Sequence, residues 1–252
     1  MENTKIEVSI ITPAFNCEKT ILSTYESIKK QTFGNWEWIV VEDHSTDNSF
    51  DFIKKITNGD NRVVLLRTES NSGAAVARNI GIQASRGRFI SFLDVDDLWM
   101  AEKLESQISY MKINGYELSC TNYQLLYSDG STREFVLKKN IINYKMLLKS
   151  NYLGCLTVIY DSRKLGKVLM PLDCEKREDY GAWLDITRSG VVAHRLNKSL
   201  SVYRIGSSSV SANKFKMIKY QYRVYRKHEK FGVFKSIWYI YLCSLNKIFK
   251  KY

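Results

Sequence analysis

The sequence lacks the features of membrane-spanning, secreted and zinc-binding proteins. No stretch reaches the roughly 18 apolar residues that a membrane span needs, and the closest, residues 236–245, is about half as long. The N-terminus has no basic segment followed by a long apolar run, as a secretory signal would. The five cysteines are scattered and form no CxxC pair, which favours reduced thiols in the cytoplasm over disulfides or structural zinc.

Acidic side chains are scarce in one part of the chain only. Overall, 38 Lys and Arg oppose 26 Asp and Glu, a formal net charge of +12. Residues 1–213 hold 27 basic and 25 acidic side chains, whereas residues 214–252 hold eleven basic side chains and one acid, Glu229. The latter segment also carries 11 of the 32 aromatic side chains. The sequence thus predicts a nearly neutral globule with a cationic, aromatic extension, which calls for an anionic partner.

Apolar runs alternate with helical patterns through the first hundred residues. Strands are expected at 8–12, 36–41, 63–66 and 89–93, with Pro13 ending the first, and helices at 18–31, 50–56 and 74–84. Strands separated by helices at this spacing predict βαβ units and a mostly parallel sheet.

The second half of the chain has a different pattern. Segments 118–126 and 132–137 flank Ser128-Asp129-Gly130, which predicts a hairpin. Further strands are expected at 153–160 and 191–195, with a helix at 179–189 between them. We therefore expect one α/β domain with a mixed sheet over residues 1–212, followed by a helical extension (213–252).

Polar clusters follow three of the predicted strands, at 13–16, 42–47 and 94–97. In an open parallel sheet, ligands bind outside the carboxyl ends of the strands. The acids Asp94, Asp96 and Asp97 repel one another and need a cation to balance them. Carboxylates suit Mg²⁺ or Mn²⁺ bound together with a diphosphate. The alternative is an acidic cap for a helix starting near Met100.

Phosphate is not held in a familiar glycine loop, because GxGxxG and GxxxxGK[ST] are both absent. Arg78, in a small-residue helix start, could reach phosphate or base, or form a surface salt bridge. Arg204, in a polar loop at 203–209, is a candidate anion contact. Glu178 and Asp179 open a predicted helix, where acids complement the helix dipole. Equally, a carboxylate there could act as a general base.

Five segments together resemble the family 2 glycosyltransferases with the GT-A fold. They occur in order within residues 6–205: VSIITPAFN (8–16), VEDHSTD (41–47), NSGAAVARN (71–79), FLDVDDLW (92–99) and RED (177–179). Among these enzymes the chain is most similar to bacterial ones that build capsule, O-antigen or teichuronic-acid-type polysaccharides. The segments NSGAAVARN, GCLTV (154–158) and YR-x₃-SxS (203–209) carry that closer resemblance.

The resemblance implies a nucleotide-sugar-binding part (1–100), an acceptor-binding part (101–212) and a role for each matched residue. The residues implied to bind the nucleotide sugar are Pro13, Ala14, Phe15, Asp43, Arg78, Asp94, Val95 and Asp96, with Asp43 accepting from the uracil N–H. Asp96, with Asp94, would hold Mn²⁺ or Mg²⁺. Asp179 would be the catalytic base, assisted by Glu178, and Arg204 a diphosphate contact. Two positions depart from the family pattern: Glu42, where Asp is more frequent, and His44, where Gly is common.

The function implied is inverting, metal-dependent transfer of a hexose. The donor would be a UDP-sugar, UDP-glucose or UDP-galactose first. The acceptor would be a hydroxyl of a saccharide linked to a polyprenyl diphosphate, in bacterial surface polysaccharide biosynthesis. Two other classes remain open: a nucleic-acid-binding protein that uses the basic aromatic extension, and a catalytically inactive partner in polysaccharide assembly.

The extension interleaves basic and aromatic residues, as helices at a membrane interface do. We therefore expect a protein attached peripherally to the inner face of the cell membrane and without nucleic acid. Two alternatives are helices that pack their aromatics on the domain and leave Lys solvated, and a homodimer formed through the same aromatics.

Overall fold

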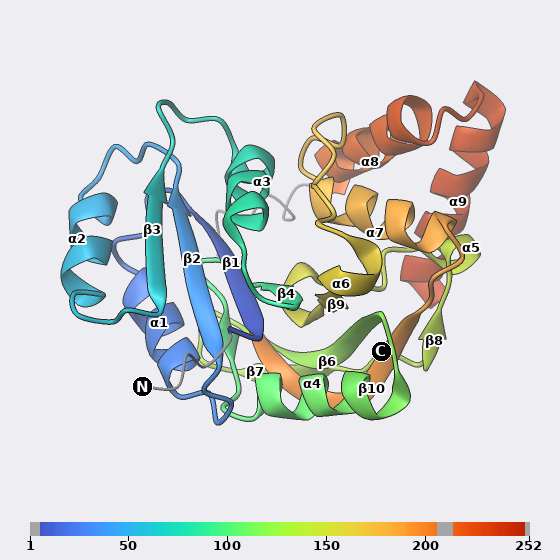
Figure 1. Ribbon diagram of the computed structural model, residues 1–252. Coiled ribbons are helices and arrows are strands. Elements are labelled where there is room, and N and C mark those ends of the chain that lie inside the picture. Colours follow the sequence, from blue (N-terminus) through green and yellow to red (C-terminus); the bar gives the residue numbers. More distant parts are fainter. Residues whose placement is uncertain (1–5, 206–213, 250–252) are drawn as a thin grey trace.

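The computed structural model describes residues 6–205 and 214–249, with a mixed sheet at its centre and helices on both faces (Figure 1). The strands are β1 (Val8–Ala14), β2 (Trp36–Glu42), β3 (Val63–Arg67), β4 (Phe89–Phe92), β5 (Leu98–Trp99), β6 (Leu118–Leu126), β7 (Thr132–Phe135), β8 (Ile141–Ile142), β9 (Ile159–Asp161) and β10 (Ala193–Arg204). The α-helices are α1 (Ile21–Lys29), α2 (Ser49–Ile56), α3 (Ala74–Ala84), α4 (Lys103–Asn114), α5 (Tyr144–Leu147), α6 (Ser162–Leu165), α7 (Glu178–Arg188), α8 (Lys214–Arg223) and α9 (Val233–Phe249).

The sheet joins a parallel half to a mixed half. Its strand order is β3-β2-β1-β4-β9-β6-β10-β5, with β7 on β6 and β8 on β10. Strands β3, β2, β1 and β4 are parallel, as βαβ units require. Strand β9 is antiparallel to both β4 and β6, and β6 is parallel to β10. The predicted βαβ units, the hairpin of β6 and β7, and the mixed sheet are therefore confirmed.

The two faces of the parallel half bury alternate side chains of the same strands. Ile10 and Trp38 belong to a core that includes residues of α1 and α4. Their neighbours Ile11 and Ile39 belong to the other core, with Ala77 of α3. Both faces are covered, so these strands read as continuous apolar runs rather than alternating ones. This arrangement fixes the strand ends from which the polar clusters project.

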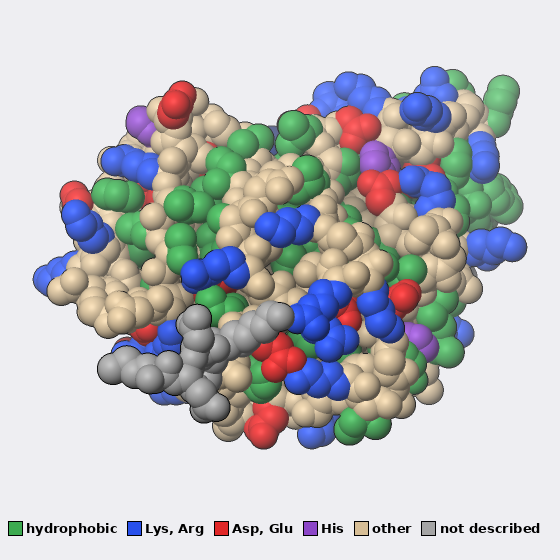
Figure 2. Space-filling view, viewed as in Figure 1, with side chains coloured by type: hydrophobic (Ala, Val, Ile, Leu, Met, Phe, Trp, Pro, Cys, Tyr) green, Lys and Arg blue, Asp and Glu red, His purple; other side chains and the backbone are tan. Residues whose placement is uncertain are grey.

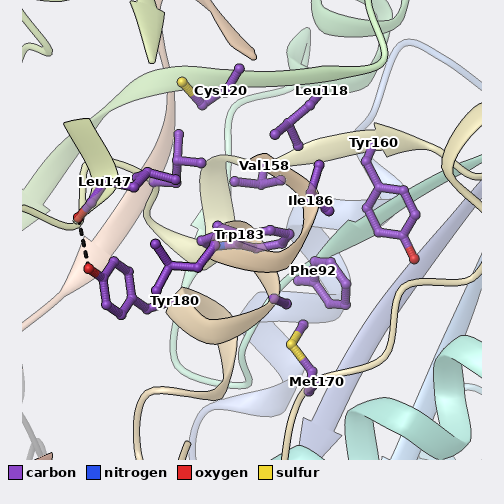
Figure 3. Close-up of a cluster of buried hydrophobic side chains, with 14 of the residues drawn as sticks. Phe92, Leu118, Cys120, Leu147, Val158, Tyr160, Met170, Tyr180, Trp183 and Ile186 are labelled. Carbon is purple, nitrogen blue, oxygen red and sulfur yellow. Dashed lines mark hydrogen bonds between the residues drawn. The ribbon is translucent and has the colours of Figure 1, made fainter. Parts of the chain in front are cut away.

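Helix α7 is anchored in the second core, which Figure 3 shows. The Trp183 ring packs edge-on against Phe92 of β4, with 5.8 Å between centroids. The Tyr180 hydroxyl donates to the Leu147 carbonyl at 2.7 Å, the dashed line in Figure 3. Trp183 and Tyr180 are fully buried. The packing holds the N-terminus of α7, and with it Glu178 and Asp179, in a fixed place.

Three expected boundaries were wrong. Strand β1 continues through Pro13, which is tolerated because the pairing of β1 with β4 ends at Ile11. The strand expected at 153–160 is interrupted by a turn of 3₁₀-helix at Cys155–Thr157, and only its last two residues belong to β9. The strand expected at 191–195 is longer, because β10 runs through Arg204 and so includes the start of the expected polar loop. The helix expected near Met100 is α4, which begins at Lys103.

The C-terminal helices pack on the domain through some aromatics and expose others. A π-helical turn (Val224–His228) follows α8, and its Tyr225 is fully buried and donates to the Leu148 carbonyl at 2.7 Å. On α9, by contrast, Phe234 is 90% and Trp238 57% exposed. Within the described ranges no helix has the length and apolarity needed to cross a bilayer. Residues 206–209 of the polar loop and the expected boundary at 212/213 lie outside the described residues.

Candidate functional site

A cleft of about 760 Å³ opens where the acidic loop after β4 faces the start of α3 and the segment entering α7. Tyr123, Tyr203 and Met217 complete its lining together with residues 154–156. Figure 2 shows the outline of the molecule notched between the α3 side and the α8 side. The cleft therefore lies at the carboxyl end of the parallel strands, where the sequence places its polar clusters.

Arg78 spans this cleft. Its guanidinium donates to Asp94 Oδ1 at 2.6 Å and to Glu178 Oε1 at 2.8 Å. The arginine is buried, with only 5% of its surface exposed. Burial opposes the charge, but Asp94 and Glu178 outweigh it and raise the pKa of Arg78. The expected salt bridge thus exists, but in the interior, where it joins two acidic segments that lie 84 residues apart in the sequence.

The three carboxylates of the acidic loop after β4 differ in their exposure to solvent. Asp96 is exposed and Asp94 is 34% exposed, and both line the cleft. Asp97 is buried and accepts from the Arg204 backbone N–H at 3.1 Å. Withdrawal from solvent, then the charge of Asp94, raise the pKa of Asp96. The Val95 carbonyl accepts from the Thr24 hydroxyl at 2.9 Å, which fixes the loop.

Asp94 and Asp96 fit a divalent cation. Both carboxylates reach the cleft, and Asp96 forms no ion pair with any residue in the described ranges. Desolvation first, and then the charge of Asp94, raise the pKa of Asp96, so a bound cation would stabilise its charged form. Oxygen ligands of this kind suit Mg²⁺ and Mn²⁺.

Asp179 lines the cleft at the N-terminus of α7. Burial, then the neighbouring charge of Glu178, raise the pKa of Asp179 to about 6, although Arg78 and Arg177 act in the opposite direction. A carboxylate with a pKa near the working pH is well matched to general-base catalysis. Glu178, paired with Arg78, is held in place as its neighbour.

Asp43 fixes the loop that begins α3. Its Oδ1 accepts from the Ser72 N–H at 2.9 Å and the Thr68 hydroxyl at 3.0 Å, and its Oδ2 accepts from the Gly73 N–H at 2.7 Å. A carboxylate can accept about four hydrogen bonds, so Oδ2 keeps acceptor capacity. Ser72 and Gly73 line the cleft, so Asp43 shapes the cleft wall from behind.

The two departures from the family pattern have structural explanations. Glu42 is fully buried, accepts from the Ser45 N–H, and lies 2.9 Å from Arg67 Nε. His44 has a φ of 56°, in the left-handed region that glycine adopts without strain. A preference for glycine at this position therefore follows from the backbone, and His44 adopts the same conformation at some cost.

Several expected ligand contacts do not line the described cleft. Pro13, Ala14, Phe15 and Asp43 are all absent from the lining of the cleft. Ala14 is buried, and Phe15 is 42% exposed. Arg204 does not line the cleft either, although the adjacent residue Tyr203 does. The Arg204 guanidinium instead donates to the Ser23 hydroxyl at 3.0 Å.

Sequence reasoning also missed residues that do line the cleft. Tyr123 comes from β6 and belongs to no motif, whereas Cys155 belongs to the segment GCLTV, which had no expected role in the site. Burial raises the pKa of the Cys155 thiol. Arg177, next to the acidic pair, is at the edge of the cleft. It is the first residue of the segment RED, of which only the two acids had an expected role.

A second polar cluster lies at Asp173, Cys174 and His228, whose ligand atoms are close enough to hold a metal ion, and Cys174 also lines the cleft. The two His228 ring nitrogens lie 3.1 Å from Asp173 Oδ1 and 3.0 Å from Asp185 Oδ1. Hydrogen bonding to Asp185 raises the pKa of His228. A protonated histidine between two acids accounts for this cluster without a metal.

Comparison with known proteins gives one family. The family model described as glycosyl transferase family 2 matches residues 9–163. TuaG of Bacillus subtilis (strain 168), named for teichuronic acid biosynthesis, is 36% identical over 252 residues, 100% of each chain. WfgD of Escherichia coli, a UDP-Glc:alpha-D-GlcNAc-diphosphoundecaprenol beta-1,3-glucosyltransferase, is 41% identical over 218 residues, 86% of this chain and 84% of its own. These matches favour an enzyme over a nucleic-acid-binding protein.

Solved structures agree on the fold. Staphylococcus aureus TarS (residues 1–349) in complex with UDP-GlcNAc superposes with a TM-score of 0.72 at 18% identity, covering 97% of this chain and 73% of that one. The mannosyltransferase PcManGT from Pyrobaculum calidifontis, in complex with GDP-Man and Mn²⁺, gives 0.69 at 15% identity, covering 95% and 73%. The expected GT-A fold is thereby confirmed.

Proposed function

The chain belongs to glycosyl transferase family 2, and from that premise we propose that it is an inverting, metal-dependent hexosyltransferase. The observation that carries the proposal is that one cleft contains both the acidic loop after β4 and a separate acid at the start of α7. Asp94 and Asp96 carry negative charge that suits a metal ion, which would in turn pair with a diphosphate. Asp179 has a pKa of about 6, which suits a general base. Arg78 contacts Asp94 and the neighbour of Asp179.

The donor half of the site comprises Asp94, Asp96, Arg78 and Asp43. Asp96 and Asp94 would hold Mn²⁺ or Mg²⁺, which when bound offsets charge on a departing nucleoside diphosphate. Arg78 supports this as a fixed positive charge that needs no reorganisation during the reaction. Asp43 Oδ2 retains the capacity to accept a uracil N–H. Pro13, Ala14 and Phe15 remain the predicted wall of the nucleoside site, and Arg204 the predicted diphosphate contact.

Asp179 is the proposed base. It accepts the proton of an acceptor hydroxyl as that oxygen bonds to C1 of the sugar, while the bond from C1 to the diphosphate oxygen breaks. One displacement from the opposite face inverts C1, so an α-linked donor gives a β-glycoside and no covalent intermediate forms. Glu178 assists by raising the pKa of Asp179.

The relatives indicate donor and acceptor classes. The name of WfgD specifies UDP-glucose as donor and GlcNAc-diphosphoundecaprenol as acceptor, and WfaP, 39% identical over 210 residues, carries the same description. We propose a UDP-hexose, UDP-glucose before UDP-galactose, and a saccharide linked to a polyprenyl diphosphate, in bacterial surface polysaccharide biosynthesis.

A lipid-linked acceptor suits a protein attached to the inner face of the cell membrane. Phe234, Ile237, Trp238 and Tyr241 recur at helical spacing on α9 and are each more than half exposed. Figure 2 shows hydrophobic side chains along the α9 edge with Lys and Arg beside them. Anionic lipid would add roughly 1 kcal/mol per basic residue near the surface.

Vesicle sedimentation tests this attachment. We expect the protein to sediment with vesicles containing phosphatidylglycerol, less with purely zwitterionic ones, and less after Trp238→Ser with Phe234→Ser. Unchanged sedimentation of the double variant, with a dimer found by light scattering, would assign the aromatics to a homodimer instead.

A donor screen tests the proposed function. Purified protein is incubated with a panel of UDP-sugars and Mn²⁺, Mg²⁺ or EDTA, and UDP release is measured beside Asp96→Ala. We expect metal-dependent release from one UDP-hexose, lost in the variant. UDP binding without release from any sugar would favour the inactive assembly partner, and the absence of UDP binding would contradict a nucleotide-sugar enzyme.

A further inference from the structure

A second cavity, of about 350 Å³, adjoins the cleft between the hairpin of β6 and β7 and the C-terminal helices. Residues of α8 and α9 form one wall, including Gln221 and Ser244. Five residues line both spaces: Tyr123, Gly154, Arg177, Tyr203 and Met217. The side cavity is therefore continuous with the cleft.

The side cavity lies on the base side of the cleft. Its lining includes neither Asp94 nor Asp96 nor Arg78, the groups of the donor half. It does include Arg177, two residues before Asp179. Asp179 itself lines only the cleft, so a molecule bound in the side cavity would reach it through the residues that the two spaces share.

Arg177 brings a positive charge to the junction, near Asp179 but without an ion-pair contact in the described part of the chain. Its Nε is buried and has no hydrogen-bond partner, and no ion pair of Arg177 occurs within the described ranges. Other arginines nearby are paired: Arg223 with Glu175, and Arg78 with Asp94 and Glu178. Because a guanidinium matches phosphate oxygens well, Arg177 is suited to an anionic ligand.

The rest of the lining suits a saccharide. Tyr123 stacks on Phe135 with 4.5 Å between ring centroids, and Tyr203 stands edge-on to Tyr123 at 6.4 Å. Aromatic rings of this kind bind the apolar face of a hexose, while a polar group fixes its orientation. Gln221 supplies one, because it is a buried polar side chain in the lining of the cavity.

We propose that the side cavity is the acceptor site, in which the saccharide lies against Tyr123 and Tyr203 and its diphosphate pairs with Arg177. This inference rests on the proposed function and deepens it. In this proposal one face of the C-terminal helices forms a wall of the acceptor site. The other face exposes Phe234 and Trp238, which would contact the lipid chain where it leaves the acceptor site.

The test compares two acceptors at fixed UDP-sugar concentration. One is GlcNAc diphosphate carrying a short prenyl chain, and the other is an alkyl glycoside of GlcNAc without phosphate. Binding is measured by calorimetry in the presence of UDP and Mn²⁺, and transfer by product formation. For Arg177→Ala we expect acceptor affinity to fall roughly 10-fold or more for the diphosphate only. Arg177→Lys should keep part of it, and UDP affinity should change less than about twofold.

A second variant tests the location. Ser244→Trp, which fills the cavity from α9, should weaken both acceptors and leave UDP binding intact. The matched controls are Arg163→Ala, an exposed arginine of α6, and Ile113→Trp, an 83% exposed site on α4. Neither should change acceptor binding.

The outcomes separate the two hypotheses. Loss of UDP affinity in Arg177→Ala would assign its charge to the donor diphosphate and overturn the proposal. Equal weakening of both acceptors, or no effect of Ser244→Trp, would also overturn it. If the unaltered protein binds the diphosphate acceptor through Arg177 but transfers no sugar from any donor, the proposed function fails while the acceptor site stands.

Discussion

Arg78 and Arg177 line the same cleft but stand in opposite electrostatic surroundings. Arg78 is buried between two carboxylates, so its charge is offset before any ligand arrives. Arg177 reaches the junction with the side cavity and has no carboxylate partner in the described part of the chain. The comparison distinguishes two kinds of charge. A charge that is already paired with protein groups holds the site together, whereas a charge without a protein partner is suited to bind a ligand.

Both arginines act on one acid, Asp179, where they lower the pKa that burial and Glu178 raise. Arg78 contributes more than Arg177. The pair therefore limits the rise in the pKa of Asp179 and favours its charged form. Each prediction below removes one part of this arrangement.

The largest effect is expected at Asp179 itself. Asp179→Asn keeps the shape of the side chain and removes the proton acceptor, so transfer should fall roughly 10²-fold or more. Donor affinity, measured by calorimetry with UDP and Mn²⁺, should stay within about twofold of the unaltered protein. Full transfer by the variant would refute the assignment of the base.

Removal of Arg78 should cost stability, unlike removal of an exposed arginine. Arg78→Ala leaves Glu178, 12% exposed, and Asp94 without their cation. We expect the free energy of unfolding in urea to fall by about 2–4 kcal/mol, against under about 0.5 kcal/mol for Arg163→Ala. Similar values for the two variants would mean that the Arg78 pairs contribute no more than a surface charge.

The pH dependence of transfer should follow Asp179. A base must be deprotonated, so kcat should decline roughly tenfold per pH unit as pH falls below about 6. Because each arginine lowers the pKa of Asp179, Arg78→Gln should move this limb to higher pH, and Arg177→Gln should move it less. A larger shift for Arg177→Gln would reverse the comparison.

The smallest effect is expected at His228, which joins the C-terminal helices to α7. Its pKa is raised by Asp185, so its stabilisation is complete below the unfolded value near 6.5 and is lost as pH rises through the folded value. His228→Gln should lower the free energy of unfolding by about 1 kcal/mol at pH 6 and less at pH 9. A loss independent of pH would exclude protonation as the cause.

How well the sequence predicted each feature depended on whether the relevant residues are neighbours in the chain. The acidic loop at 94–97 and the pair Glu178-Asp179 are contiguous, so their chemistry could be read directly. The partner of Arg78 could not, because Glu178 lies 100 residues away and only packing of α7 around Trp183 brings it near. Side-chain packing of this kind leaves no local pattern.

Backbone conformation was predicted where hydrophobic period decides it and missed where tertiary contacts do. Helix α3 was expected at 74–84 and occupies Ala74–Ala84. The 3₁₀ turn at Cys155–Thr157 has the apolar composition of a strand. Its conformation instead accompanies a tertiary contact, because the Trp99 ring N–H donates to the Leu156 carbonyl at 2.9 Å. His44 likewise reveals its positive φ only in three dimensions.

The most direct test of the account is the anomeric configuration of the product. The unaltered protein is incubated with an α-linked UDP-hexose and the diphosphate-linked acceptor, and the new glycosidic bond is assigned by proton NMR. Because Asp179 activates the acceptor for one displacement, the account predicts a β-linkage only. An α-linked product would contradict the single displacement and with it the role of Asp179.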